Sequence, residues 1–179
     1  EVIRYFLISS HYRSPINYSL EIIEQCKSAL ERLYTCRQSL DFAIKNAKDV
    51  PDDTELIDRL NSRRDQFIKA MDDDLNTADG VAAIFDLVKD INTSILDKDV
   101  SENVCNTAAK VFDELCDVLG ILYNRKSNDV DADIEALIEK RQTARANKDW
   151  ATADSIRDEL KAKGIILKDT PQGVTWTKE

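Results

Sequence analysis

The chain has 179 residues, of which 42% are hydrophobic and 33% charged, and a formal net charge of −9. This length accommodates one domain, or one domain with a small appendix, and the composition is that of an ordinary soluble protein. With only 4 Gly and 3 Pro the chain has few turns for a sandwich or barrel, and without a run of about eighteen apolar residues it has no membrane span.

Residues 2–9, near the N-terminus, form a short apolar run. The run lacks the basic region and the small-residue cleavage site of a signal peptide, so we expect a cytoplasmic protein. It also lacks an initiator Met, and we interpret Glu1 as an internal residue of a longer protein. Pro15 biases Ser14 away from helical conformation, which predicts a turn here.

Four amphipathic helices are predicted next, each preceded by residues that favour a helix start. They begin after Ser19, after Pro51–Asp53, at Asn76 or Thr77, and after Ser101, and the fourth ends at Gly120. Apolar residues recur along each helix at helical spacing. In the fourth helix the predicted inward residues are Val104, Ala108, Val111, Phe112, Leu115, Val118 and Leu119. Amphipathic helices with short connections predict an antiparallel bundle.

The composition changes after the bundle. Residues 124–132 are polar and are predicted to form a linker. Two short helices follow, at about 133–147 and 150–163, and then two short strands around a turn at Pro171–Gly173. The predicted fold is therefore mainly α: an antiparallel helical bundle (1–123), a linker (124–132), and a small domain of two helices and a short β-hairpin (133–179).

The charge of the chain is unevenly spread. Residues 1–132 contain 16 Lys and Arg against 25 Asp and Glu, whereas residues 133–179 contain 9 of each. An acidic surface repels nucleic acid, so if the chain binds RNA, the neutral C-terminal end is the better place for it.

No catalytic or metal-binding constellation is found in the sequence. The four cysteines show no CxxC spacing and His11 is the only histidine, so no zinc site is predicted. The run Asp72–Asp74 contains the carboxylates that a divalent cation needs. Three adjacent residues at a helix boundary converge poorly on one ion, and we interpret them as an end cap with solvated charge.

Residues 141–150 are the most informative stretch. On a helix, Arg141, Arg145 and Lys148 continue the stripe of Ile134, Leu137 and Ile138, and the cationic part ends beside Trp150. Guanidinium groups bind phosphate or a guanine edge, and an indole provides a stacking surface for an unpaired base. The alternative is that Trp150 fills the core between the two helices while the cations solvate the outside.

Two acidic residues have a similar pair of interpretations. Asp154 lies one helical turn after Trp150, and Asp169 lies at the junction of strand and turn. Each carboxylate can form an ordinary ion pair, or it can accept a hydrogen bond from a base amino group and so discriminate between bases. The sequence pattern leaves both open.

Three blocks of the sequence resemble one known family. Residues 4–7 (RYFL) and 10–19 (SHYRSPINYS) resemble the segment that follows the KMSKS loop in bacterial cysteinyl-tRNA synthetases. Residues 70–77 (AMDDDLNT) resemble the signature of that family's DALR-type helical bundle. Residues 144–165 and the ending 169–176 are similar to the family's anticodon-binding domain. The position of Lys168 is often acidic in the family, so this hairpin is slightly more basic.

The resemblance implies the tRNA-binding C-terminal region of a cysteine–tRNA ligase, with a bundle that leans on the tRNA and a small domain that reads the anticodon. Trp150 would stack on an anticodon base. The implied nucleic-acid-binding residues are Arg145, Trp150, Asp154 and Asp169. Further candidates for RNA contact are Arg13, Arg141, Lys148 and Gln172. Trp176 is expected in the core.

The resemblance also implies what this chain lacks. The family's HIGH-type motif, KMSKS loop and zinc ligands are absent, so ATP and zinc are implied only for a catalytic domain of the same polypeptide, and this chain alone is not expected to be an enzyme. The implied partners are tRNA(Cys) and that catalytic domain, with no membrane, and we expect a monomer.

Two other functions compete with this interpretation. A helical structural or protein-interaction domain without RNA binding would suit the acidic residues 1–132. A ligase that joins cysteine to a small molecule is the second, but such relatives lack the anticodon-reading end that this chain resembles.

Overall fold

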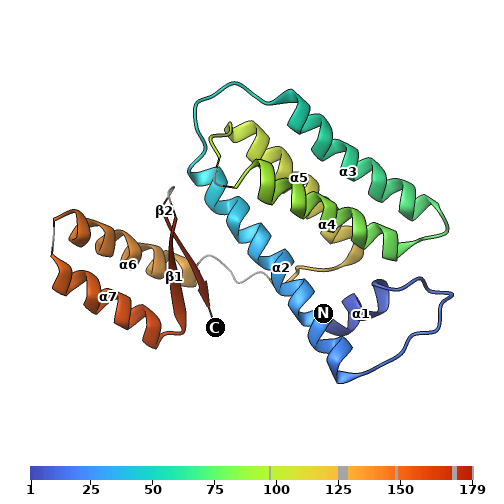
Figure 1. Ribbon diagram of the computed structural model, residues 1–179, viewed down its shortest axis with the longest axis horizontal. Coiled ribbons are helices and arrows are strands. Elements are labelled where there is room, and N and C mark those ends of the chain that lie inside the picture. The colour runs from blue at the N-terminus through green and yellow to red at the C-terminus, as the bar shows by residue number, and fades with distance from the viewer. Residues whose placement is uncertain (97, 125–128, 148, 171–172, 179) are drawn as a thin grey trace. The chain divides into compact units, whose positions relative to one another are not determined.

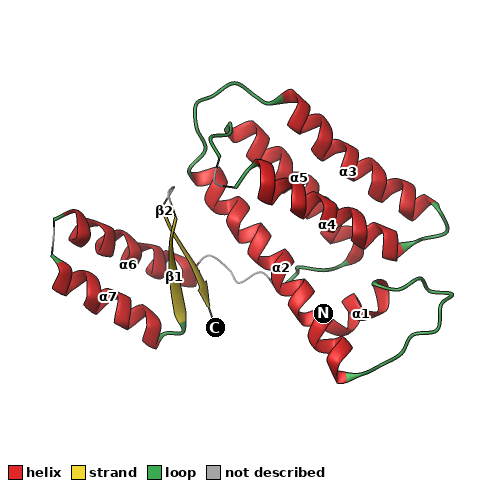
Figure 2. Cartoon of the chain, in the orientation of Figure 1, coloured by secondary structure: helices red, strands yellow, loops and turns green. Residues whose placement is uncertain are grey.

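The computed structural model describes residues 1–96, 98–124, 129–147, 149–170 and 173–178. Over these ranges the chain forms seven helices and one antiparallel pair of strands, so the fold is mainly α, as predicted (Figure 2). It divides into two compact units, Glu1–Asn124 and Arg125–Glu179. Within the described ranges, no helix combines the length and the apolar character that crossing a membrane requires.

The first unit is a helical bundle. Its helices are α1 (Val2–Ile8), α2 (Leu20–Lys45), α3 (Thr54–Asp72), α4 (Thr77–Ser94) and α5 (Glu102–Leu119). Consecutive helices from α2 to α5 run in opposite directions (Figure 1). Helix α3 packs on α4 and α5, α2 packs on α5 and α4, and the short α1 packs on α2.

The predicted capping residues are confirmed. The side chains of Ser19, Asp53, Asn76 and Ser101 each accept a hydrogen bond from the backbone N–H three residues later. These bonds satisfy donors that the first turn of a helix leaves unpaired. Helix α5 ends at Gly120, whose φ of 63° is left-handed and favours glycine.

The bundle core is aliphatic, with Phe112 as its largest fully buried side chain. The prediction for Val118 is wrong, because this residue is 60% exposed. Cys116 is fully buried instead, so the packed face of α5 turns away from Val118 at that level. Gly80 brings α3 and α4 close together, since a Cβ there would lie 3.2 Å from the Phe67 ring.

Among the ion pairs of the bundle's described residues, those of Asp90 have the most buried carboxylate. Asp90 is 9% exposed, and its carboxylate lies 2.7 Å from Nε of Arg63 and 3.6 Å from Nε of Arg59. The hydrogen bond to Asp90 raises the pKa of Arg63. Arg63 also lies 3.7 Å from Asp86, whose side chain is 55% exposed. Arg63 of α3 therefore forms ion pairs with one buried and one exposed carboxylate of α4.

Replacing these two carboxylates should have unequal effects. We expect Asp90→Ala to lower the free energy of unfolding by about 1–3 kcal/mol, because a mostly buried guanidinium loses its partner. We expect Asp86→Ala to cost less than about 1 kcal/mol, because that pair is exposed. Urea unfolding followed by far-UV circular dichroism measures both.

Tryptophan fluorescence supplies an internal control for this comparison. Both of the chain's 2 tryptophans, Trp150 and Trp176, lie in the second unit, so the fluorescence transition should not move in either variant. Equal losses for Asp90→Ala and Asp86→Ala would show that burial does not strengthen the Asp90 pair.

The start and the end of the bundle are joined by hydrogen bonds. The Glu1 carboxylate accepts from the Tyr34 hydroxyl at 2.8 Å and from the Leu122 backbone N–H at 2.5 Å. The Tyr34 oxygen in turn accepts from the Asn124 backbone N–H at 3.1 Å. Arg4 donates to the Gly120 carbonyl at 2.8 Å. Burial and the bond to Glu1 raise the pKa of Tyr34 to about 12.

This raised pKa predicts a pH dependence of stability. The ordinary value is 10.0, so Tyr34 should ionise in the unfolded chain before it ionises in the folded one. Its contribution is complete below pH 10 and is lost as the pH rises toward about 12. The stability difference between the wild type and Tyr34→Phe should therefore shrink over this window. A constant difference, in denaturant titrations across the window, would contradict this assignment.

The second unit contains two helices and a hairpin: α6 (Asp129–Ala146), α7 (Trp150–Ala162), β1 (Ile165–Thr170) and β2 (Gly173–Lys178). The strands pair antiparallel, with Ile165 opposite Lys178 and Thr170 opposite Gly173. Helix α6 begins at Asp129, so residues 129–132, which we placed in the linker, are helical. The rest of the predicted linker after Asn124, residues 125–128, lies outside the described part.

Candidate nucleic-acid interface

The interior of the second unit is small and aliphatic. Among the described residues, the large aliphatic side chains buried here come from α6, α7 and β1: Ile138, Ile156, Leu160 and Ile165. Leu137, Leu167 and Val174 are partly buried against them. This cluster fixes α6 against α7 and the hairpin, and thereby decides which side chains of the helices face water.

The corner between α6 and α7 is closed by hydrogen bonds. The Asp149 side chain accepts from the Thr152 backbone N–H at 3.2 Å, and the Asp149 N–H donates to the Ala144 carbonyl at 2.8 Å. Hydrogen bonds from Thr152 hold the pKa of the Asp149 carboxyl below its ordinary value. Arg145 in the last turn of α6 and Trp150 at the start of α7 flank this corner.

Trp150 lies outside the core. Its side chain is in the exposed class, with 59% of the residue accessible, whereas Ala153, three residues later, is buried at 4%. Trp150 precedes the first inward-facing position of α7, so the indole projects beyond the packed interior. The alternative in which Trp150 fills the core between the helices is therefore wrong. An accessible indole can serve as a stacking surface for a base.

The two arginines of α6 differ in exposure. Arg145 is exposed, but Arg141 is only 9% exposed. Arg141 lies three residues from both Ile138 and Ala144, which are buried, so it occupies the packed side of the helix. The predicted cationic stripe is therefore not a continuous outward ridge, and its third member, Lys148, lies outside the described residues.

Asp154 lies on α7 with its side chain 64% exposed. Its Oδ1 is 3.2 Å from Nη1 of Arg157, and Nη2 of the same guanidinium is 3.4 Å from Oδ1 of Asp158. Arg157 was not among the residues predicted to contact RNA. The spacing of three residues between Asp154 and Arg157 was a signal that could have predicted this pair.

Three predicted residues of the hairpin are only partly described. Asp169 lies in β1 opposite Val174, and Trp176 lies in β2 opposite Leu167, but their side chains are outside the description. Gln172 is outside it entirely. The strand positions agree with the predicted hairpin, and the expected contacts of Asp169 and Gln172 stay predictions.

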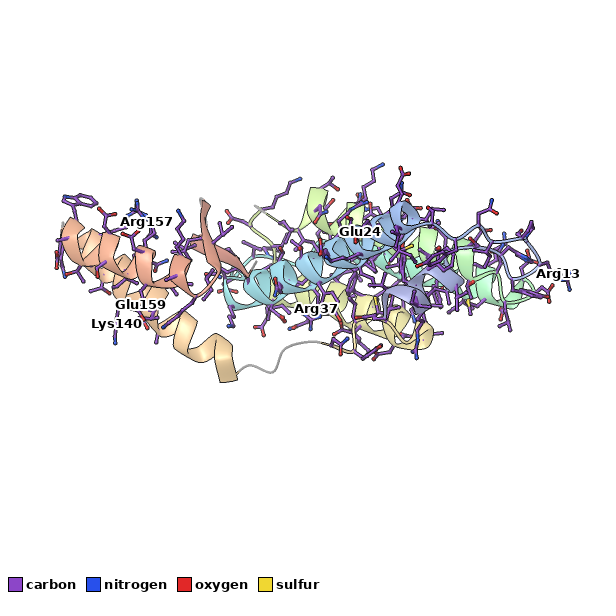
Figure 3. All side chains as sticks on the ribbon, turned by 90° about the horizontal axis from the view of Figure 1, so that it is seen from below. Arg13, Glu24, Arg37, Lys140, Arg157 and Glu159 are labelled. Atoms are coloured by element: carbon purple, nitrogen blue, oxygen red, sulfur yellow. The ribbon has the colours of Figure 1, made fainter. Side chains whose placement is uncertain are left out.

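Arg13 lies in the first unit, in the loop between α1 and α2 (labelled in Figure 3). Its guanidinium is 2.7 Å from Oδ2 of Asp74, and the Tyr12 hydroxyl donates to the same oxygen at 2.8 Å. That hydrogen bond raises the pKa of Tyr12. Of the acidic run, Asp72 ends α3, Asp73 is its C-cap and Asp74 anchors this loop.

The described residues of this chain do not fit a zinc site. All four cysteines are free and buried, and burial raises the pKa of Cys36 to about 12. Zinc binds the thiolate form, which such a pKa disfavours at neutral pH. Across the described ranges, no three His, Cys, Asp or Glu side chains come together as metal ligands would.

Comparison with known proteins finds a matching domain family in each of the two units. Residues 66–123 match the model of the DALR domain, and residues 127–176 match that of the cysteinyl-tRNA ligase anticodon binding domain. The chain is 46% identical over 179 residues to a cysteine–tRNA ligase of Geobacillus sp. strain WCH70 and 46% identical over 180 residues to that of Staphylococcus carnosus. The Halalkalibacterium halodurans ligase is 45% identical over 178 residues.

Each alignment covers 99% of this chain, but the chain spans only 38% to 39% of the length of these relatives. The likeness thus extends through both units and includes the corner around Trp150. The chain belongs to the cysteine–tRNA ligase family, and it carries that family's DALR domain and anticodon-binding domain.

Proposed function

We propose that this chain is the tRNA-binding C-terminal region of a cysteine–tRNA ligase and that its second unit reads the anticodon of tRNA(Cys). The observation that carries the proposal is the exposed indole of Trp150 at the start of α7, with Arg145 also exposed in the last turn of α6. The match of residues 127–176 to an anticodon-binding domain supports it.

In this proposal each side chain has a separate task. Trp150 stacks on an unpaired anticodon base, which contributes roughly 1–3 kcal/mol per base. Arg145 donates to a guanine edge or a phosphate, and the carboxylates of Asp154 and Asp169 accept from base amino groups. Stacking accepts any base, so discrimination comes from the hydrogen bonds.

The remaining candidates have weaker support. Lys148 and Gln172 flank the proposed surface in the sequence and stay candidates for RNA contact. Arg13 is exposed, but its ion pair with Asp74 gives it a structural task in the bundle. Arg141 is left out, because its side chain is 9% exposed.

Charge sets the expected strength of binding. Residues 133–179 contain equal numbers of basic and acidic residues, 9 of each, so the second unit has no net field to attract RNA. Affinity then depends on a few local contacts, and it should be modest and should fall as salt rises.

Cysteine activation belongs to another part of the longer protein in this proposal. ATP and zinc would bind there, in the cytoplasm, and the whole protein would act as a monomer. Six exposed hydrophobic residues lie within the first twenty: Ile3, Leu7, Tyr12, Ile16, Tyr18 and Leu20. We assign this apolar surface to contact with the catalytic domain of the same polypeptide.

Removing the indole should weaken RNA binding without unfolding the unit. We expect Trp150→Ala to raise the Kd for a tRNA(Cys) anticodon stem-loop about 5- to 150-fold, because a stacked base is lost. Ile166→Ala is the matched control, since Ile166 is an exposed hydrophobic residue of β1. Fluorescence anisotropy of labelled stem-loop measures both, and circular dichroism should show unchanged helical content. Equal Kd values for wild type and Trp150→Ala would contradict stacking.

The competing function, a helical interaction domain without RNA binding, has its own test. The wild-type chain should bind the cysteine anticodon stem-loop more tightly than a loop changed at one anticodon base, by about 1–3 kcal/mol if a base-edge hydrogen bond is lost. Both titrations are run at the same low salt. The absence of any preference would favour the interaction domain, because phosphate contacts alone do not distinguish the two loops.

A further inference from the structure

Arg157 is held between two carboxylates on the exposed side of α7. Its guanidinium lies 3.2 Å from Oδ1 of Asp154 and 3.4 Å from Oδ1 of Asp158. Figure 3 shows Arg157 on the side of the helix pair opposite Lys140 and Glu159. The three side chains are 54%, 64% and 69% exposed, so this cluster is not part of the core.

The exposure of this cluster limits what it does for folding. Ion pairs on a protein surface are screened by water and salt and contribute little to stability. The same pairs become stronger when a ligand covers them and excludes water. The cluster is therefore better suited to fix a local geometry during binding than to stabilise the helix.

The spacing along α7 places Arg157 next to the proposed base-reading residues. Asp154 is four residues after Trp150, and Arg157 is three residues after Asp154, so the three follow one stripe of the helix. In this proposal Asp154 lies one helical turn from the indole on which the base stacks. Arg157 contacts Oδ1 of Asp154, and a carboxylate has further lone pairs for N–H donors.

We propose that Arg157 is a positioning residue for base discrimination: it holds the Asp154 carboxylate in the orientation in which it accepts from a nucleobase amino group. This inference rests on the proposed reading of the anticodon. Without Arg157 the Asp154 side chain samples other rotamers, and the hydrogen bond that distinguishes bases becomes less favourable.

The other role open to Arg157 is direct binding of an RNA phosphate. Asp158 argues against it, because the guanidinium is flanked by two carboxylates and the trio has a net charge of −1. Such a cluster repels a phosphate, whereas an amino group of a base is attracted to it.

The test measures discrimination in four versions of this chain. Discrimination is the Kd for a stem-loop changed at one anticodon base, divided by the Kd for the cysteine anticodon stem-loop. The four versions are the wild type, Arg157→Gln, Arg157→Lys and Lys161→Gln. Lys161→Gln removes the same charge from the exposed surface of α7, one turn after Arg157. The changed base is the one at which Asp154→Asn lowers discrimination most.

We expect Arg157→Gln to lower discrimination about 3–10-fold, in the range of direct coupling between neighbouring side chains. Arg157→Lys should retain more discrimination than Arg157→Gln, because the ammonium keeps the positive charge. It should stay below the wild type, because an ammonium cannot bridge both carboxylates. Lys161→Gln should leave discrimination unchanged. In an Asp154→Asn background, Arg157→Gln should cause no further loss, since Arg157 acts through Asp154.

Three results would overturn the inference, and they are distinguishable. If the wild type discriminates but Arg157→Gln does so equally well, Arg157 has no positioning role although the proposed function stands. If Arg157→Gln lowers discrimination equally in the Asp154→Asn background, Arg157 contacts RNA directly. The dependence of affinity on salt would then also fall by about one phosphate contact. If the wild type itself does not discriminate, the proposed function fails and the inference fails with it.

Discussion

The exposure of Trp150 depends on which side chains close the interior of the second unit. Four buried aliphatic residues, Ile138, Ile156, Leu160 and Ile165, fill it, while Trp150 stays 59% exposed. Keeping a large indole in water sacrifices the hydrophobic stabilisation that its burial would give. The corner sealed by Asp149 holds this indole at the first position of α7. That exposure leaves the ring accessible, as the proposed stacking of an unpaired base requires.

The first unit has a much larger hydrophobic core than the second. Its long helices share an extensive aliphatic core, and the largely buried ion pair Arg63–Asp90 joins α3 to α4. Hydrogen bonds among Glu1, Tyr34 and Asn124 join the beginning of this bundle to its end. The acidic charge of residues 1–132 opposes RNA binding, so the bundle suits a scaffold better than a base-reading surface.

Much of the fold could be predicted from the sequence, because local signals decided it. The caps at Ser19 and Ser101 and the stop at Gly120 are set by hydrogen bonds within a few residues. Predictions that depended on packing were less secure. Val118 has the right spacing but faces water, and Arg141, although charged, occupies the packed side of α6. Whether Trp150 was core or surface could not be read from the pattern, because that depends on where α7 meets α6.

The most direct test of the central claim follows the indole itself. In ¹H–¹⁵N spectra the chain has two indole N–H signals, from Trp150 and Trp176, and Trp176→Phe assigns them. On titration with the cysteine anticodon stem-loop, the Trp150 signal should move progressively and saturate, because ring currents of a stacked base act on it. If backbone signals elsewhere saturate while the Trp150 indole does not move, the base does not stack there, and the account is contradicted.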